Sequence, residues 1–315
     1  MRRNIILDCD PGIDDAVALA IAAAHREELK LLAITTVAGN QTIDRVTNNA
    51  LKLVNFLGIK DVPVARGSAA PLIREVIPAE DVRGSTGLGD CLLPETGKAP
   101  ASEQGVVFLA DTILKLPQGE TVTLVPTGPL TNIALLLKVF PQVKKRIDLI
   151  CLMGGAAVGG NVTATGEFNI WQDPEAAQIV FHSGIPIVMC GLDVTNYCGF
   201  TETQIREMLE NPNPVVHAYG EMTDFYLRSR PYCRGSIAAI HDAVTVTWLM
   251  HPEWFRGREM QVEVDCSEGQ NRGMTVCDFR EWAQPEKRSG VTVLLEADTE
   301  KIQKFWLEAL YSYQN

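Results

Sequence analysis

The chain has 315 residues, of which 46% are hydrophobic, and a formal net charge of −11. This acidic balance, with no basic run, argues against a nucleic-acid partner or an anionic membrane surface, and no stretch approaches the roughly 20 apolar residues of a membrane span. The chain runs straight into a strand-like segment and its eight cysteines form no CxxC pair, so we expect no signal peptide and a cytoplasmic protein with reduced thiols.

Apolar, β-rich segments alternate with helical patterns over the first part of the chain. The predicted strands cover 4–7, 31–37, 121–125, 149–153 and 186–189. The predicted helices cover 14–24, 43–57, 104–116, 130–140 and 174–182. This alternation predicts an α/β fold with an open, mostly parallel, doubly wound (Rossmann-like) sheet and helices on both of its faces.

The pattern changes after about residue 201. A mostly helical region runs to 250, short strands follow near 260–264, 274–277 and 291–295, and a last helix covers 298–313. No repeat, low-complexity tract or linker separates these segments. We therefore expect a single domain over residues 1–315 with a helical C-terminal region.

Four aspartates lie close together where the first predicted strand ends and the first helix begins: Asp8, Asp10, Asp14 and Asp15. Carboxylates crowded this closely repel one another and raise each other's pKa unless a positive charge lies among them. A helix N-terminus can use one or two acids, but not four. The cluster therefore favours a bound cation, and all-oxygen ligands favour a hard one such as Ca²⁺ or Mg²⁺.

Three other short segments directly follow predicted strands. They are residues 38–40, 126–129 and 154–155. Ligands of open parallel sheets bind beyond the carboxyl ends of the strands. We therefore expect these segments to meet the aspartate cluster at one edge of the sheet.

An ordered series of motifs spans nearly the whole chain: Asp10-Pro11-Gly12-Ile13-Asp14-Asp15, Val37-Ala38-Gly39-Asn40, Pro126-Thr127-Gly128-Pro129-Leu130-Thr131-Asn132, Met153-Gly154-Gly155, Gly160-Asn161, Glu167-Phe168-Asn169 and His241-Asp242-Ala243. The series resembles the inosine-uridine preferring nucleoside hydrolases. The resemblance implies an open, largely parallel α/β sheet and one tightly held Ca²⁺ per chain. It also implies hydrolysis of the N-glycosidic bond of a purine and/or pyrimidine ribonucleoside to ribose and free base.

The resemblance assigns the metal and catalytic residues. The carboxylates of Asp10, Asp15 and Asp242 and the main-chain carbonyl of Thr127 are expected to bind the metal. Cleavage of a ribosyl C–N bond passes through an oxocarbenium-like state, which needs nearby negative charge and an activated water. Asp10 is expected to act as the general base on a metal-bound water, and His241 to assist the leaving base.

The resemblance also assigns the ribose contacts. Asp14 and Asn169 are expected to hold the 2′- and 3′-hydroxyls, and Asn161 and Glu167 the 5′-hydroxyl. Asn40, which alone would be interpreted as a turn residue, is expected to lie near the metal and the sugar. A carboxylate at the 5′-hydroxyl would repel a 5′-phosphate, so nucleotides should be poor substrates.

The chain departs from the family pattern at Arg83, where many members carry a histidine in a His-Gly-x-x-Gly-Leu context. Arginine stays protonated and cannot act as a general acid, but it can place a fixed charge on a base carbonyl such as O2 of a pyrimidine. Alternatively, Arg83 points to solvent from a loop. Other possible base contacts are Phe168, Tyr226 and Arg230, and these residues do not decide between purine and pyrimidine.

Two other classes of protein remain possible. Asp8-Cys9-Asp10 after a strand also matches the Asp-x-Asp signature of haloacid-dehalogenase-like phosphatases, with Asp8 as nucleophile and Asp10 as general acid. The second alternative is a non-catalytic nucleoside-binding protein, which only Arg83 favours. The resemblance implies a homodimer or homotetramer acting in nucleoside salvage.

Overall fold

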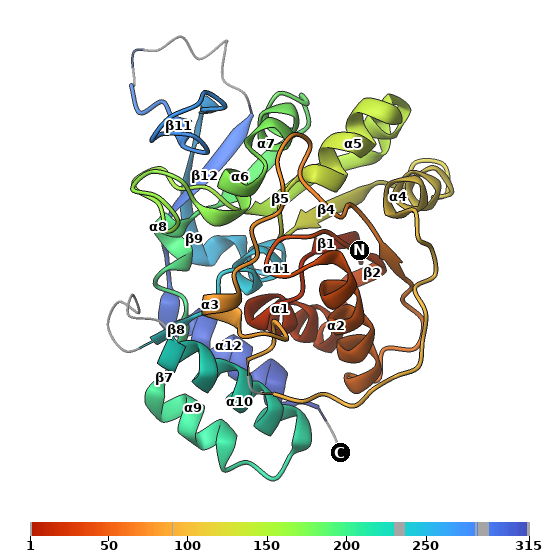
Figure 1. Cartoon of the computed structure of the whole chain (residues 1–315), viewed down its shortest axis with the longest axis vertical. Helices are drawn as coiled ribbons and strands as arrows, with labels where there is room; N and C mark the ends of the chain where they lie inside the picture. Colours follow the sequence, from red (N-terminus) through yellow and green to blue (C-terminus); the bar gives the residue numbers. More distant parts are fainter. Residues whose placement is uncertain (1, 90, 230–236, 281, 283–289, 314–315) are drawn as a thin grey trace.

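The computed structural model describes residues 2–89, 91–229, 237–280, 282 and 290–313 (Figure 1). Its centre is an eight-stranded sheet in the order β3-β2-β1-β4-β5-β6-β12-β9. All neighbours pair in parallel except the edge strand β9, which runs antiparallel to β12. The strands are β1 (Arg3–Cys9), β2 (Leu29–Thr36), β3 (Val64–Arg66), β4 (Val122–Pro126), β5 (Ile147–Met153), β6 (Ile187–Cys190), β9 (Phe255–Met260) and β12 (Val291–Ala297).

Helices cover both faces of this sheet, and Figure 1 shows α1, α2 and α12 on one side and α4, α5 and α7 on the other. Side chains alternate along β1, so that Ile5 and Leu7 join the core beneath α1 while Ile6 joins the core beneath α5. The helices of the first face are α1 (Ile13–Ala24), α2 (Ile43–Phe56), α10 (Pro214–Ser229), α11 (Ala243–Met250) and α12 (Thr299–Tyr311). Those of the second are α4 (Gly105–Leu114), α5 (Thr131–Val139) and α7 (Pro174–Phe181).

Shorter elements complete the chain. Two small antiparallel sheets pair β7 with β8 and β10 with β11. The elements are α3 (Glu80–Arg83), η1 (Pro141–Arg146), α6 (Phe168–Gln172), α8 (Leu192–Thr195), β7 (Gly199–Thr201), α9 (Glu202–Leu209), β8 (Ile237–Ala239), η2 (Pro252–Trp254), β10 (Val262–Val264) and β11 (Thr275–Cys277).

The predicted fold class is confirmed, and each predicted strand and helix of the parallel region is present. The strand predicted near 260–264 is present as β10, which begins at Val262 in a small separate sheet, whereas β9 ends at Met260 in the main sheet. Residue types alone do not reveal that these two neighbouring strands belong to different sheets. Within the described ranges the cysteines are free, and no helix combines the length and the apolar character that crossing a bilayer requires.

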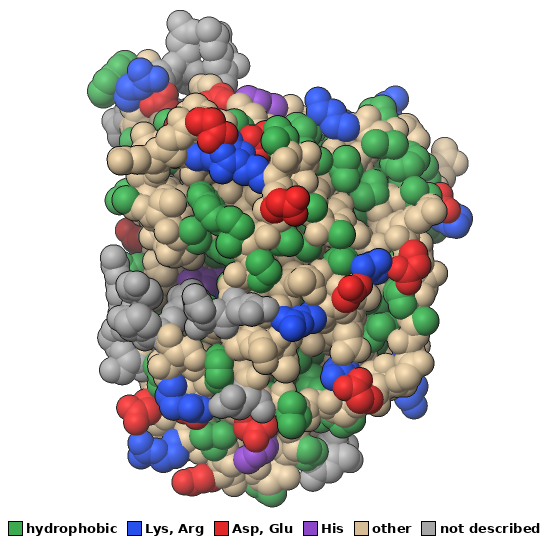
Figure 2. Space-filling view, in the orientation of Figure 1, with side chains coloured by type: hydrophobic (Ala, Val, Ile, Leu, Met, Phe, Trp, Pro, Cys, Tyr) green, Lys and Arg blue, Asp and Glu red, His purple; other side chains and the backbone are tan. Residues whose placement is uncertain are grey.

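The surface carries both signs of charge. Figure 2 shows Lys and Arg side chains spread singly among acidic and apolar ones on the face it displays. This agrees with the net charge of −11, which disfavours a polyanionic partner.

Trp306 of α12 offers a test of the core on the α1 face. Its side chain is fully buried, contacts Phe200 edge to face and donates from Nε1 to Thr247 Oγ1 at 2.7 Å. We expect Trp306→Ala to lower the free energy of unfolding by about 3–5 kcal/mol in urea denaturation, because it removes a large buried side chain. Trp282, which is 83% exposed, is the matched control, and Trp282→Ala should change stability by less than about 0.5 kcal/mol. Equal effects of the two substitutions would contradict this packing.

Candidate active site

The carboxyl ends of four neighbouring strands bring the site together. In the parallel register, Asp8 of β1 lies opposite Thr35 of β2 and Pro126 of β4. The segments that follow these strands therefore leave the sheet at one edge, and the segment after β5 joins them there. The convergence expected from the strand pattern is observed.

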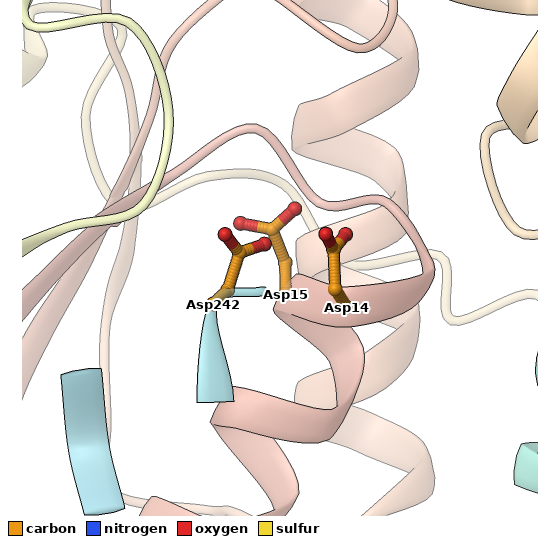
Figure 3. Close-up of side chains that lie close together, drawn as sticks. All are labelled: Asp14, Asp15 and Asp242. Carbon is orange, nitrogen blue, oxygen red and sulfur yellow. The ribbon is translucent and has the colours of Figure 1, made fainter. Parts of the chain in front are cut away.

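Three buried carboxylates face one another at this edge: Asp14 and Asp15 in the first turn of α1, and Asp242 at the N-terminus of α11. One oxygen of each lies within 4.8 Å of the others, and Figure 3 shows all three side chains pointing the same way. The Asp242 side chain makes no capping hydrogen bond to its own helix, so its carboxylate is not used there. Acids from opposite ends of the chain thus form one cluster.

Asn40 holds two of the acids in place. Its backbone N–H donates to Asp10 Oδ2 at 2.6 Å, and its Nδ2 donates to Asp15 Oδ2 at 3.3 Å. Asp15 also accepts from the Thr127 hydroxyl at 2.8 Å through Oδ1. A Cβ at Gly39 would lie 2.2 Å from Asp10 Oδ2, so only glycine allows this close approach. Asn40 is therefore part of the site and more than a turn residue.

Burial dominates the electrostatics of the cluster. Desolvation, reinforced by neighbouring aspartates, raises the pKa of Asp15 to about 6 and the pKa of Asp10 and Asp242 well above 3.8. For Asp14, burial is outweighed by the guanidinium of Arg83, and its pKa is lowered. Arg83 Nη2 lies 2.8 Å from Asp14 Oδ2.

The donor set fits a hard cation. Asp10 Oδ1 and Asp14 Oδ1 are buried and have no hydrogen-bond partner among the residues that the structure describes. Buried oxygens left unpaired are costly, and a divalent cation would satisfy them. An arrangement of carboxylates without sulfur or imidazole ligands suits Ca²⁺ or Mg²⁺.

A pocket of about 530 Å³ opens beside the cluster. Ten of the predicted residues line it: Asp14, Asn40, Arg83, Thr127, Asn161, Glu167, Phe168, Asn169, His241 and Asp242. Asp10 and Asp15 do not line it but are buried next to Asn40. Four apolar lining residues, Ala79, Val82, Met153 and Val162, were not predicted, since isolated apolar side chains carry no sequence signal for a pocket.

Glu167 and Asn169, which line the pocket, form hydrogen bonds with backbone groups of neighbouring segments. Glu167 is the N-cap of α6, and its two oxygens accept backbone N–H groups of Gly155, Asn169 and Ile170. Burial raises its pKa to about 7. Asn169 Nδ2 donates to the carbonyl oxygen of Thr127 at 2.9 Å. The capping role of Glu167 was not predicted, although Glu at this position precedes a helical turn.

Arg83 also lines the pocket, from the short helix α3, and is only 6% exposed. Besides its ion pair with Asp14, its guanidinium carbon lies 4.7 Å from the centre of the Tyr226 ring. The alternative that Arg83 points to solvent is therefore wrong. Tyr226 does not line the pocket but packs against Arg83, and Arg230 lies outside the described residues.

His241 lines the pocket, and a hydrogen bond that the sequence did not predict holds its ring. Its Nδ1 lies 2.8 Å from the hydroxyl of Thr195, in α8. The two residues are far apart in sequence, and a threonine in a short apolar segment gives no signal of such a contact. Sequence reasoning therefore missed it.

Comparison with known proteins shows which family the chain belongs to. Residues 5–304 match the inosine-uridine preferring nucleoside hydrolase family. The pyrimidine-specific ribonucleoside hydrolase RihA of Shewanella baltica is 46% identical over 95% of this chain and 93% of that protein, and RihA of Photobacterium profundum is 42% identical over 99% and 100%. A purine-preferring ribonucleoside hydrolase of Gardnerella vaginalis superimposes with a TM-score of 0.89 at 31% identity, covering 98% of each chain. A plant nucleoside hydrolase superimposes with a TM-score of 0.91 at 30% identity, covering 99% and 100%.

The chain belongs to the inosine-uridine preferring nucleoside hydrolase family. It is an N-glycosyl hydrolase whose substrates are small-molecule ribonucleosides. The phosphatase interpretation is wrong, and the geometry gives a reason. Asp8 does not line the pocket, is 1% exposed, and its Oδ1 accepts hydrogen bonds from Thr35 and Asn132, so it cannot attack a substrate there.

The buried acids predict an unusual pH dependence of stability in the absence of metal. Below its ordinary pKa of 3.8, Asp15 is protonated in both the folded and the unfolded chain. Above it the unfolded chain releases the proton, while the folded chain keeps it until about pH 6, so stability falls as the pH rises through this window. Asp15 alone should contribute a loss on the order of 3 kcal/mol, measurable by urea unfolding in a chelator at about pH 4 and about pH 7.

Asp15→Asn is the matched control for this measurement, because the amide does not titrate. The variant should lose less stability than the wild-type chain over the same range. A wild-type loss no larger than that of the variant would show that Asp15 does not titrate as the buried geometry requires.

Proposed function

We propose that this chain is a Ca²⁺-dependent hydrolase that prefers pyrimidine ribonucleosides. The observation that carries the proposal is the carboxylate cluster formed by Asp14, Asp15 and Asp242 beside a pocket that ten of the predicted residues line. The pyrimidine preference is supported by the relatives named pyrimidine-specific, which at 42–46% identity resemble this chain more than the purine-preferring enzyme does at 31%.

The proposed metal ligands are the carboxylates of Asp10, Asp15 and Asp242 and the main-chain carbonyl of Thr127. Asp14 belongs to the same cluster, but its Oδ2 is paired with Arg83. We therefore assign Asp14 to the sugar. When bound, Ca²⁺ would lower the pKa of a water molecule and orient the ribose hydroxyls.

In the proposed mechanism, Asp10 takes a proton from the attacking water as general base. Its Oδ2 already accepts the backbone N–H of Asn40, so Oδ1, which has no hydrogen-bond partner in the described part of the chain, would serve both the metal and the attacking water through its two lone pairs. The surrounding carboxylates favour the positive charge that develops on the ribose ring as the C–N bond breaks. His241, which also lines the pocket, assists the departing base.

The proposed sugar contacts follow the lining of the pocket. Asp14 and Asn169 bind the 2′- and 3′-hydroxyls, and Asn161 and Glu167 bind the 5′-hydroxyl, with Asn40 between metal and sugar. Asn169 Nδ2 is used by the Thr127 and Met153 carbonyls, so its Oδ1 is the atom that would accept from a hydroxyl. Glu167 keeps one carboxylate lone pair beyond its three backbone bonds.

At the base end we propose Arg83 and Phe168 as contacts, with Tyr226 supporting Arg83. One donor of the buried guanidinium, Nη1, has no hydrogen-bond partner among the described residues. A carbonyl beside the glycosidic nitrogen, as in uracil and cytosine, would satisfy it and receive a fixed positive charge. We further propose a single domain over residues 1–315, a homodimer or homotetramer, a cytoplasmic location and a role in nucleoside salvage.

A panel of nucleosides tests the proposed function. The chain is incubated with uridine, cytidine, inosine and adenosine in the presence of Ca²⁺, and ribose is measured by a reducing-sugar assay. We expect ribose from uridine and cytidine at higher kcat/KM than from the purine nucleosides. Uridine 5′-monophosphate should be a poor substrate above about pH 7, where Glu167 is ionised and repels its phosphate. No ribose from any nucleoside would favour the non-catalytic alternative and overturn the proposal.

The role of Arg83 is tested by Arg83→Gln. Loss of a charged hydrogen bond to the leaving base should lower kcat/KM for uridine by about 10- to 100-fold. The loss should be smaller for inosine, which presents a ring nitrogen instead of a carbonyl beside the glycosidic bond. Arg83→Lys, which keeps the charge, should fall between the wild-type chain and Arg83→Gln. If neither variant changes kcat/KM for any nucleoside, Arg83 does not contact the base.

A further inference from the structure

The contact between Thr195 and His241 has no part in the roles proposed so far. The hydroxyl of Thr195 lies 2.8 Å from His241 Nδ1, and both residues are buried, at 0% and 3% exposure. Thr195 is the last residue of α8, whereas His241 lies between β8 and α11. Two segments distant in sequence therefore meet here, and the backbone N–H of Ile240, which donates to Cys198 O at 2.8 Å, also joins them.

The helix that carries Thr195 is firmly attached to the segment after β5. Leu192 N donates to Gly155 O at 2.9 Å, and the carboxylate of Asp193 accepts the backbone N–H groups of Ala157 and Val158 at 2.7 and 3.1 Å. Asn161 and Glu167, the proposed contacts to the 5′-hydroxyl, belong to the same segment. The position of Thr195 is thus fixed relative to the sugar end of the pocket.

An imidazole acts on a substrate through one ring nitrogen, and the partner of the other nitrogen sets the orientation and the tautomer of the ring. Because Nδ1 of His241 is bound to Thr195, proton exchange with a leaving base falls to Nε2. Catalysis depends strongly on such orientation, and a misplacement of about 1 Å can lower a rate by about 100-fold.

We propose that Thr195 is a positioning residue for His241: its hydroxyl holds the imidazole with Nε2 directed at the leaving base. This inference rests on the proposed role of His241 in base departure. A simpler role is also open to a buried threonine, namely to satisfy a polar atom and stabilise the fold. The two roles differ in which substrates they affect.

The leaving group separates the two roles. In the proposed mechanism uracil leaves with assistance from His241. By contrast, 4-nitrophenolate leaves 4-nitrophenyl riboside as a stable anion that needs no proton. We expect Thr195→Val to lower kcat for uridine by about 10- to 100-fold and to change kcat for 4-nitrophenyl riboside by less than about 3-fold. Thr195→Ser, which keeps the hydroxyl, should recover most of the activity on uridine.

Thr123→Val is the matched control. Thr123 is equally buried and donates its hydroxyl to the Asp148 side chain at 2.9 Å, on β4 and away from the pocket. This substitution should leave the ratio of the two substrates unchanged. Thr195→Ala, with thermal unfolding and Ca²⁺ affinity as checks on folding, replaces Thr195→Val if that variant does not fold.

A double-mutant cycle with His241→Ala completes the test. If Thr195 acts through His241, Thr195→Val should have no further effect on uridine turnover in the His241→Ala background. The inference would be overturned if Thr195→Val lowered kcat equally for uridine and 4-nitrophenyl riboside. It would also be overturned if Thr195→Val lowered uridine turnover in the His241→Ala background as much as in the wild-type chain. In both cases His241 would keep its proposed role. If His241→Ala itself leaves uridine turnover unchanged, the proposed role of His241 fails, and the inference fails with it.

Discussion

The structure depends on the burial of several carboxylates beside the end of β1. Asp8, Asp10, Asp14, Asp15 and Asp242 are each at most 2% exposed, and their pKa values are raised by burial except at Asp14, where Arg83 outweighs it. Water cannot screen such charges, so protons, an internal cation or a bound metal must offset their repulsion. Arg83 supplies one positive charge, to Asp14, and the unpaired oxygens Asp10 Oδ1 and Asp14 Oδ1 leave a demand for another. The demand at Asp10 is the physical basis of the proposed Ca²⁺ site, and Asp14 Oδ1 is the oxygen left for a ribose hydroxyl.

The same cluster joins the two ends of the pocket. Asp14 lies at the proposed sugar end and is paired with Arg83 at the proposed base end, and Arg83 in turn packs on Tyr226 of α10. On the other side, α8 connects the segment after β5 to His241. Sugar, metal and base contacts are thus held by one connected set of buried groups. A substitution of Arg83 should therefore affect the sugar contacts as well as the base contacts. Comparing nucleosides that share a sugar separates the two effects.

Much of the architecture could be predicted from sequence because buried parallel strands are continuous apolar runs, and the polar segments after them must meet at one edge. The resemblance placed Asp242 and His241 beside the N-terminal acids, which no local pattern could do. Other features depend on three-dimensional packing and leave no periodic signal. The neighbouring strands β9 and β10 belong to different sheets, Arg83 turns inward to Asp14, and Thr195 reaches His241 from α8. Each is decided by a neighbour distant in sequence.

The central claim is that acids from both ends of the chain share one divalent cation. Calorimetric titration of the metal-free protein with Ca²⁺ tests it most directly, with Asp242→Asn as the variant and Asp278→Asn as the control, since Asp278 is an acid outside the cluster that pairs with Arg280. The account predicts one Ca²⁺ per chain, bound at least about 10-fold more weakly by Asp242→Asn and unchanged in Asp278→Asn. Absence of saturable binding, or equal affinity in Asp242→Asn and the wild-type chain, would contradict it.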